Sequence, residues 1–137
     1  MSKRNKNPYK RCKYLDDLNI PITDYGTNFC NQNTDNRARK WRRQRTKYGF
    51  DERETWSIDE LFVEWIYTRF KMFKRIACID LTFYKFHYID KEITQEEAID
   101  IILASCEDYL KTPFTERKFL SNEVCTLIFK VMPAMWW

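Results

Sequence analysis

The sequence predicts a mainly α-helical domain with a minor β-hairpin element and a basic N-terminal arm. The chain has 137 residues, which suits one domain, and only two of them are glycine. So few glycines disfavour sheets with many tight turns and glycine-rich phosphate loops. Phe, Trp and Tyr make up 17% of the residues. So many large rings need a core or a partner, which disfavours a chain that is disordered throughout.

The charge divides the chain into an arm, residues 1–49, and an aromatic-rich body, residues 50–137. The arm carries 13 Lys and Arg against 4 acids, a net charge of +9. The body carries 11 Lys and Arg against 16 acids, a net charge of −5. Such an asymmetry favours a basic, partner-binding region followed by a helical body.

The first part of the arm, residues 1–33, has no regular apolar pattern. Pro8 and Pro21 interrupt any long element, and only the stretch from Tyr14 to Leu18 has helical spacing. We expect an extended segment with at most one short helical turn, which lies on another surface or orders on a partner. The basic start is not followed by an apolar stretch, so we expect no secretory signal.

The second part of the arm, residues 34–48, predicts an arginine-rich helix. Thr34, Asp35 or Asn36 suits its start, and Gly49 suits the position just after its end. The helix has too few apolar residues to bury much area by itself. The residues able to face a core are Thr34, Ala38, Trp41 and Tyr48.

The basic residues of this helix spread around its circumference and predict a nucleic-acid or nucleoprotein interface. Guanidinium groups suit phosphate because they are planar forks that stay charged. Trp41 is placed to stack on an unpaired base or to enter a hydrophobic slot. Two alternatives are a helix that stays solvated or docks on the acidic body, and a helix that docks on an acidic protein. The predicted interface consists of Arg37, Arg39, Lys40, Trp41, Arg42, Arg43, Arg45 and Lys47.

The junction between arm and body predicts a structural joint. Residues 57–60, Ser-Ile-Asp-Glu, have the form of a capping box ahead of an amphipathic helix over residues 58–77. Trp56 precedes the box at the position of a hydrophobic staple, so we expect it to be largely buried. The charged residues at 51–54 are expected to form ion pairs with the basic helix before them.

Two more helices are expected in the body. Residues 94–97, Thr-Gln-Glu-Glu, form a second capping box, and the apolar helix that follows ends near Pro113. This helix is apolar over more than half of its circumference, so we expect it at the centre of the core. The last helix is expected over about residues 116–132, with Phe119 facing inward and Pro133 stopping it.

A short β-hairpin is expected between residues 79 and 93, where aromatic and branched residues replace the helical pattern. Tyr88 would pair with Ile93 across a turn at Asp90 and Lys91. Because that turn lacks a glycine, a continued helix or an ordered loop is the alternative. His87 is the only histidine, and we expect a half-buried packing role for it.

The terminal tryptophans and the cysteines carry less specific signals. Trp136 and Trp137 are expected to tuck into the core, and otherwise to form a protein interface. The five cysteines are odd in number and have no close pair spacing, which predicts reduced thiols in a cytosolic protein. No apolar run is long enough to span a membrane.

Two neighbouring segments resemble a known group of proteins. The first is residues 48–59, Tyr-Gly-Phe-Asp-Glu-Arg-Glu-Thr-Trp-Ser-Ile-Asp, and the second is residues 64–71, Glu-Trp-Ile-Tyr-Thr-Arg-Phe-Lys. This pattern resembles uncharacterised small bacteriophage proteins with Gly-aromatic-Asp, Thr-Trp-Ser/Asn and Arg-x-Lys elements. The resemblance covers about residues 48–111 and implies a phage origin but no activity. The chain departs from that pattern at Asp90 and Lys91, where a glycine is common, and at Phe70, where leucine is common.

The function predicted from these observations is that of a non-enzymatic phage binding protein, active in the host cytoplasm. Its expected partner is a nucleic acid or a host nucleoprotein complex, and an inhibitor of host defence of the anti-CRISPR type fits its size. The alternative is a virion or assembly protein that self-associates through Trp136 and Trp137. The weakest alternative is a small nuclease with a metal held by Asp51, Glu54 and Asp59. No nucleotide, hydrolase or zinc motif is present, so we expect no cofactor and no resident metal.

Overall fold

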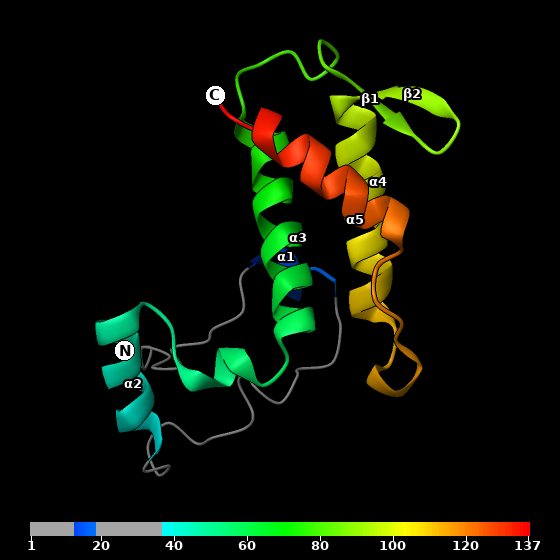
Figure 1. Ribbon diagram of the computed structural model, residues 1–137. Coiled ribbons are helices and arrows are strands. Elements are labelled where there is room, and N and C mark those ends of the chain that lie inside the picture. Colours follow the sequence, from blue (N-terminus) through cyan, green and yellow to red (C-terminus); the bar gives the residue numbers. More distant parts are fainter. Residues whose placement is uncertain (1–12, 19–36) are drawn as a thin grey trace. The chain divides into compact units, whose positions relative to one another are not determined.

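The computed structural model describes residues 13–18 and 37–137, which form helices and one small antiparallel sheet (Figure 1). This architecture confirms the predicted fold class. The contacts divide the chain into two compact units, Met1–Leu61 and Phe62–Trp137. Most of the predicted extended segment lies outside the described residues, as do the capping candidates at 34–36 and the cysteines at 12 and 30.

The first unit contains α1 (Lys13–Asp16), α2 (Arg37–Tyr48) and the 3₁₀ turn η1 (Glu52–Thr55). The predicted arginine-rich helix is therefore present as α2. Gly49 ends it as expected, because its φ of 85° lies in the left-handed region that favours glycine. The Gly49 N–H donates to the Arg45 carbonyl at 2.9 Å, which satisfies one of the last carbonyls of the helix.

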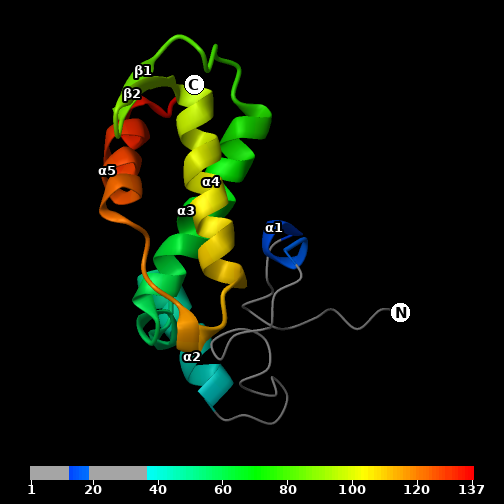
Figure 2. The ribbon, with the colours of Figure 1, turned by 90° about the vertical axis from the view of Figure 1, so that its right-hand side faces the viewer.

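The second unit is built around three helices. They are α3 (Ile58–Ile76), which begins four residues before the boundary between the units, α4 (Gln95–Lys111) and α5 (Asn122–Val131). In Figures 1 and 2, α3 and α4 run side by side in opposite directions, and α5 packs across α4. Lys74 of α3 forms a salt bridge with Asp100 of α4.

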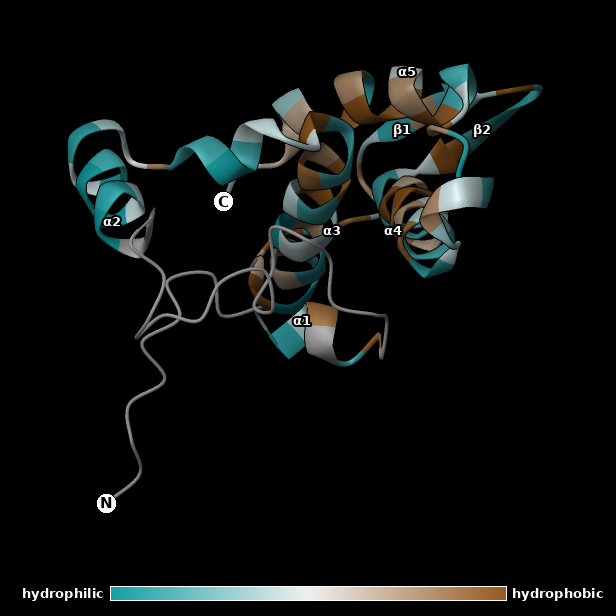
Figure 3. Ribbon diagram, turned by 90° about the horizontal axis from the view of Figure 1, so that it is seen from below, coloured by the Kyte–Doolittle hydropathy of each residue, from teal (hydrophilic) through white to brown (hydrophobic). Residues whose placement is uncertain are grey.

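Aliphatic side chains fill the interior of this second unit. Figure 3 colours α3, α4 and α5 with long hydrophobic stretches, whereas α2 is almost entirely hydrophilic. Burying these side chains is the main stabilising contribution, at about 1.5–3 kcal/mol for each large one. Deeply buried aliphatic residues include Val63, Ile66, Ile99, Ile102, Ile128 and Val131.

The second predicted capping box is confirmed at the start of α4. The Thr94 hydroxyl accepts from the Glu97 N–H at 3.2 Å, and the Glu97 carboxylate accepts from the Thr94 N–H at 3.3 Å. Both bonds satisfy backbone amides that have no partner inside the helix. Eight α4 residues are buried, in agreement with its predicted central place.

The predicted hairpin is present, but its register differs from the prediction. Strand β1 (Lys85–Tyr88) pairs with β2 (Lys91–Thr94), so that Tyr88 lies opposite Lys91 and Phe86 opposite Ile93. The turn residues are Ile89 and Asp90, and Ile89 adopts a φ of 58°. A β-branched residue is rarely left-handed, so the sequence carried no signal for a turn at this position.

The last helix begins later than predicted, and Phe119, which was expected to face the core, is exposed. Ser121 caps α5 by accepting the Val124 N–H at 3.2 Å, whereas residues 117–120 are not helical. The Arg117 guanidinium donates to the Thr112 carbonyl at 3.1 Å, a bond to the extended segment that connects α4 with α5. Phe119 is half exposed, although its ring contacts the Tyr109 ring edge-on at 6.0 Å.

Two predictions about single side chains in the second unit are wrong. His87 is exposed, because alternate residues of β1 point to opposite faces and Phe86 and Tyr88 take the inner one. Trp136 and Trp137 are 66% and 61% exposed rather than tucked into the core. The chain passes through Pro133 in a further 3₁₀ turn, η3 (Met132–Ala134), before these two residues.

Candidate functional site

The arginine-rich helix α2 has two different sides. A helix turns by about 100° per residue, so Trp41 and Arg45 share one side, and Arg39 and Arg43 share the opposite side. Trp41 is 1% exposed and the Arg45 side chain is mostly covered. The basic residues are therefore sorted by their surroundings. The exposed set, here called the α2 basic face, consists of Arg39, Lys40, Arg42, Arg43 and Lys47.

Trp41 is a packing residue, in agreement with its place among the residues able to face a core and not with its place in the predicted interface. The Arg53 guanidinium lies over its ring, with the guanidinium carbon 4.0 Å from the ring centroid. The Trp56 ring meets it edge-on at 6.3 Å, and the Trp41 indole N–H donates to Glu52 at 2.9 Å. One cationic neighbour, one aromatic neighbour and a hydrogen bond hold the indole in place, so no base can reach it in this structure.

Trp56 is 45% exposed, so the prediction of a largely buried staple residue is wrong. Its ring contacts the ring of Trp41, which also belongs to the first unit, and this contact is aromatic rather than aliphatic. In a hydrophobic staple, Trp56 would pack on an apolar residue one turn into α3. In the structure, the half-exposed Trp56 ring instead packs against the buried Trp41 indole.

The chain after Gly49 contributes a buried ion pair to the same side of α2. Asp51 accepts from Arg45 at 2.8 Å and from Arg53 at 3.2 Å, and the side chains of Asp51 and Arg53 are completely buried. The Arg53 N–H also donates to Asp51 at 2.9 Å, which caps η1, and the Asp51 N–H donates to Glu54 at 3.2 Å. These bonds compensate the cost of removing the charges from water.

Glu52 completes the contacts between η1 and α2. Its carboxylate pairs with Lys40 at 3.0 Å, and its N–H donates to the Gln44 side chain at 3.0 Å. The Lys40 ammonium and the Trp41 N–H both hold the pKa of Glu52 below its ordinary value of 4.5. The predicted ion pairs between residues 51–54 and the helix are thus confirmed for Asp51 and Glu52. We call this set the anchor network: Trp41, Arg45, Asp51, Glu52 and Arg53.

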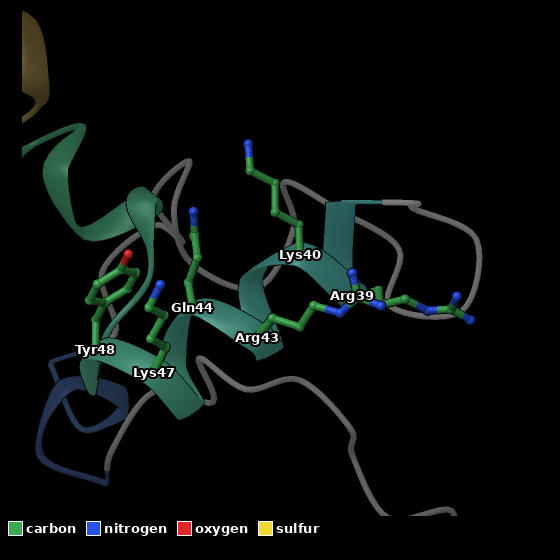
Figure 4. A pocket seen from close by; sticks show the side chains of 6 residues that line it. All are labelled: Arg39, Lys40, Arg43, Gln44, Lys47 and Tyr48. Carbon is green, nitrogen blue, oxygen red and sulfur yellow. The ribbon is translucent and has the colours of Figure 1, made fainter.

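The α2 basic face adjoins the anchor network only at Lys40, which pairs with Glu52. Within the described residues, Arg39, Arg42, Arg43 and Lys47 form no salt bridge. Their side chains line two open hollows of about 300 and 320 Å³ along α2. Figure 4 shows the first hollow, with Lys40 extending to one side and Arg43 and Arg39 extending toward the start of the helix.

Two exposed aromatic residues at the end of α2 were not recognised from the sequence as part of a site. Tyr48, a predicted core candidate, is 60% exposed, and Phe50 is 48% exposed. Tyr48 lines the first hollow together with the cations (Figure 4). The signal available in the sequence was the position of both residues beside Gly49, where the helix stops.

The remaining predicted site residues are placed as follows. The side chain of Arg37 lies outside the described part of the chain, and Trp136 and Trp137 belong to the second unit. Asp51 and Glu54 are engaged in capping η1.

In the portion of the chain that the structure describes, no group of three His, Cys, Asp or Glu side chains is arranged to hold a metal ion. No described helix is both long enough and apolar enough to cross a membrane.

Comparison of the chain with models of protein families, with curated proteins and with solved structures finds no match.

Proposed function

We propose that this protein is a non-enzymatic binding protein whose α2 basic face engages the phosphate backbone of a nucleic acid, either free or within a nucleoprotein complex. The observation that carries the proposal is the separation of roles on α2. One side of the helix supplies the anchor network, while the cations of the opposite side stay exposed. Folding therefore uses Arg45 and leaves Arg39, Arg42 and Arg43 available for a partner.

The arrangement of the exposed cations suits a polyanion. Arg39, Arg43 and Lys47 follow one another at four-residue spacing, so they form a row about 12 Å long on one side of the helix. Duplex DNA presents one phosphate charge per about 1.7 Å of its axis, and a row of this length can meet several of them. Arg42 widens the row, and arginine binds phosphate through two parallel hydrogen bonds.

Among the described residues, the acids next to the helix pair with Lys40 but with none of the other cations of this face. Asp51 bonds Arg45 and Arg53 on the anchor side, and Glu52 reaches only Lys40 at the edge of the basic face. This distribution favours an external acidic partner over docking of the exposed arginines on neighbouring acids. Phosphate is favoured over an acidic protein because the face combines three guanidinium groups and no acid.

The biological setting we propose is a phage protein that acts in the cytoplasm of its host. The resemblance of residues 48–111 to small bacteriophage proteins supports the origin. The small size and the basic helix support an inhibitor of a host defence complex of the anti-CRISPR type. Such complexes expose nucleic-acid backbone, which the α2 basic face would contact.

A salt titration with matched variants tests the proposal. In the test variant, Arg39, Arg42, Arg43 and Lys47 are replaced by Gln, which keeps helix propensity and leaves Arg45 in the anchor network. In the control variant, the same loss of four charges is made at Lys85, Lys91, Lys118 and Lys130, which are exposed in the second unit. Binding of labelled nucleic acid is measured by fluorescence anisotropy at several salt concentrations.

For the wild type, we expect log K to fall with log salt, with a slope of about −0.7 to −0.9 per phosphate contacted. The test variant should lose binding and the control variant should keep it. Equal binding by the test variant and the wild type would contradict the proposal. A pull-down from host lysate with and without nuclease then tells whether the captured partner is nucleic acid, protein or both.

A second candidate function is self-association in a virion or an assembly complex. It is favoured by the exposure of Trp136, which lines a hollow of about 190 Å³ with Phe83, Tyr84 and Ile79. Exposed aromatic residues of this kind are common anchors of protein interfaces. Light scattering during gel filtration would support this candidate if the wild type is oligomeric and a Trp136→Ser, Trp137→Ser variant is monomeric.

A further inference from the structure

The α2 basic face ends in a pair of exposed aromatic rings. Tyr48 is the last residue of α2, and Phe50 follows one residue later. The two ring centroids are 6.5 Å apart, and the ring planes are tilted by 45°. Both residues keep about half of their surface in contact with solvent, although burying such rings is normally favourable.

Gly49 sets the geometry of this pair. Its left-handed φ of 85° ends α2 and turns the chain directly after Tyr48. A Cβ at Gly49 would meet no atom within 4 Å, so glycine is favoured here by the backbone conformation rather than by crowding. The turn places the Phe50 ring beside the Tyr48 ring instead of one further step along the helix.

Cations of the basic face adjoin the Tyr48 ring. The Lys47 ammonium lies over that ring, 5.2 Å from its centroid. Tyr48 also lines the same hollow as Lys40, Arg43 and Arg39 (Figure 4). An aromatic ring that borders a row of cations is the combination by which proteins hold unpaired nucleotides, with the base on the ring and the phosphate on the cation.

We propose that Tyr48 and Phe50 form a base-stacking platform, so that the α2 basic face takes single-stranded nucleic acid in preference to a duplex. The inference rests on the proposed phosphate binding by α2 and specifies its ligand. Paired bases are stacked inside a duplex and cannot reach the two rings. In a single strand the bases are available, and every base offers a flat face for stacking.

The buried state of Trp41 strengthens the assignment to this pair. Trp41 is enclosed by Arg53 and Trp56, so the aromatic surface that α2 offers at the basic face comes from Tyr48. Phe50 extends that surface beyond the end of the helix. Successive bases of one strand would occupy the two tilted rings, while Lys47 and Arg43 hold the phosphates that join them.

The test compares single-stranded and duplex ligands with ring-removing and ring-keeping variants. The ligands are a labelled 15-nucleotide U strand, a labelled 15-nucleotide dT strand, and a labelled 15-base-pair DNA duplex. The ring-removing variant is Tyr48→Leu, Phe50→Leu, and the ring-keeping variant is Tyr48→Phe, Phe50→Tyr. The matched control is Phe114→Leu, which removes an exposed ring in the second unit.

We expect the wild type and the ring-keeping variant to bind both single strands more tightly than the duplex. The ring-removing variant should lose roughly tenfold in single-strand affinity for each base that stacks. Its duplex affinity and its salt slope should stay unchanged, and Phe114→Leu should behave as the wild type. The U and dT strands distinguish an RNA partner from a DNA partner.

Unchanged single-strand affinity in the ring-removing variant would overturn the stacking role, as would an equal loss for single strand and duplex. If the variant instead loses a protein captured from nuclease-treated lysate, the pair belongs to a protein contact and the inference fails. Absence of any nucleic-acid binding by the wild type would overturn the proposed function itself, which is a distinguishable result.

Photochemical crosslinking of the wild type provides a second measurement that does not depend on variant folding. A single strand containing 5-iodouracil crosslinks to aromatic side chains that stack on the modified base. Peptide mapping by mass spectrometry should place the crosslink on Tyr48 or Phe50. Crosslinks found only on other residues would overturn the inference.

Discussion

The anchor network of the first unit and the aliphatic core of the second unit hold their helices by different chemistry. In the first unit, α2 is fixed by a buried indole, a stacked guanidinium and ion pairs to Asp51 and Glu52. In the second unit, α3, α4 and α5 are held mainly by buried apolar side chains, aliphatic and aromatic, with one salt bridge from Lys74 to Asp100 between α3 and α4 (Figure 3). Polar anchoring depends on each partner being present, whereas apolar packing depends on volume and area.

This difference explains how a helix can carry so many arginines and still fold against its unit. Arg45 and Arg53 both pair with Asp51, and Trp41 supplies a large buried surface among the described residues of α2. Arg39, Arg42, Arg43 and Lys47 are exposed and take no part in these contacts. The comparison predicts that the two regions respond to different perturbations.

The largest expected effect is the loss of α2 packing in Trp41→Ala. Removing a buried tryptophan costs about 3–5 kcal/mol, and here it also removes the stacking contact with Arg53 and the hydrogen bond to Glu52. Hydrogen exchange measured by mass spectrometry should show lost protection in residues 37–48. Trp56→Ala is the control, because that ring is half exposed and its edge contact is worth only about 0.5–1.5 kcal/mol. Equal effects of the two variants would contradict the assigned roles.

The corresponding change in the second unit is Ile102→Ala. Ile102 is completely buried, so its truncation should lower the free energy of unfolding by about 2–5 kcal/mol. Amide protection should fall in residues 95–111 and remain unchanged in residues 37–48. Phe129→Ala, at an exposed position of α5, should change stability by less than about 0.5 kcal/mol. Loss of α2 protection in the Ile102 variant would show that the two regions do not unfold separately.

A stabilising change is expected at the hairpin turn. Ile89 is exposed and has a positive φ, which costs a residue with a Cβ about 1–2 kcal/mol. Asn tolerates this conformation, so Ile89→Asn should raise the midpoint of chemical denaturation. Ile89→Val keeps the β-branch and should bring no gain. A lower midpoint for the Asn variant would mean that the Ile89 side chain contributes more than its backbone strain costs.

The smallest expected effect is the acid sensitivity of α2. Folding lowers the pKa of Glu52, so its contacts with Lys40 and Trp41 add stability above its ordinary pKa of 4.5. That contribution fades as the pH falls through the lower pKa of the folded state. Protection of residues 37–48 should therefore decrease in acid, and Glu52→Gln should flatten this decrease. Glu96→Gln, at an exposed position of α4, should leave the profile unchanged; the reverse pattern would exclude Glu52 as the cause.

Local chemistry explains what the sequence by itself determined. The capping box at Thr94 and the end of α2 at Gly49 were predicted because each depends on groups within a few residues of one another. The helices α3 and α4 follow from the periodicity of their apolar residues. The exposed arginines of the candidate site were predicted in the same way, since a dense basic segment has few partners within its own helix.

Only the tertiary structure decided which side chains of α2 are buried. Trp41 and Glu52 are eleven residues apart, and no spacing rule shows that the chain returns to bring them together. The same return buries Arg53 and Asp51, and it separates Arg45 from the arginines of the basic face. Neighbouring arginines are chemically identical in a sequence, so their roles differ only by which groups the fold places against them.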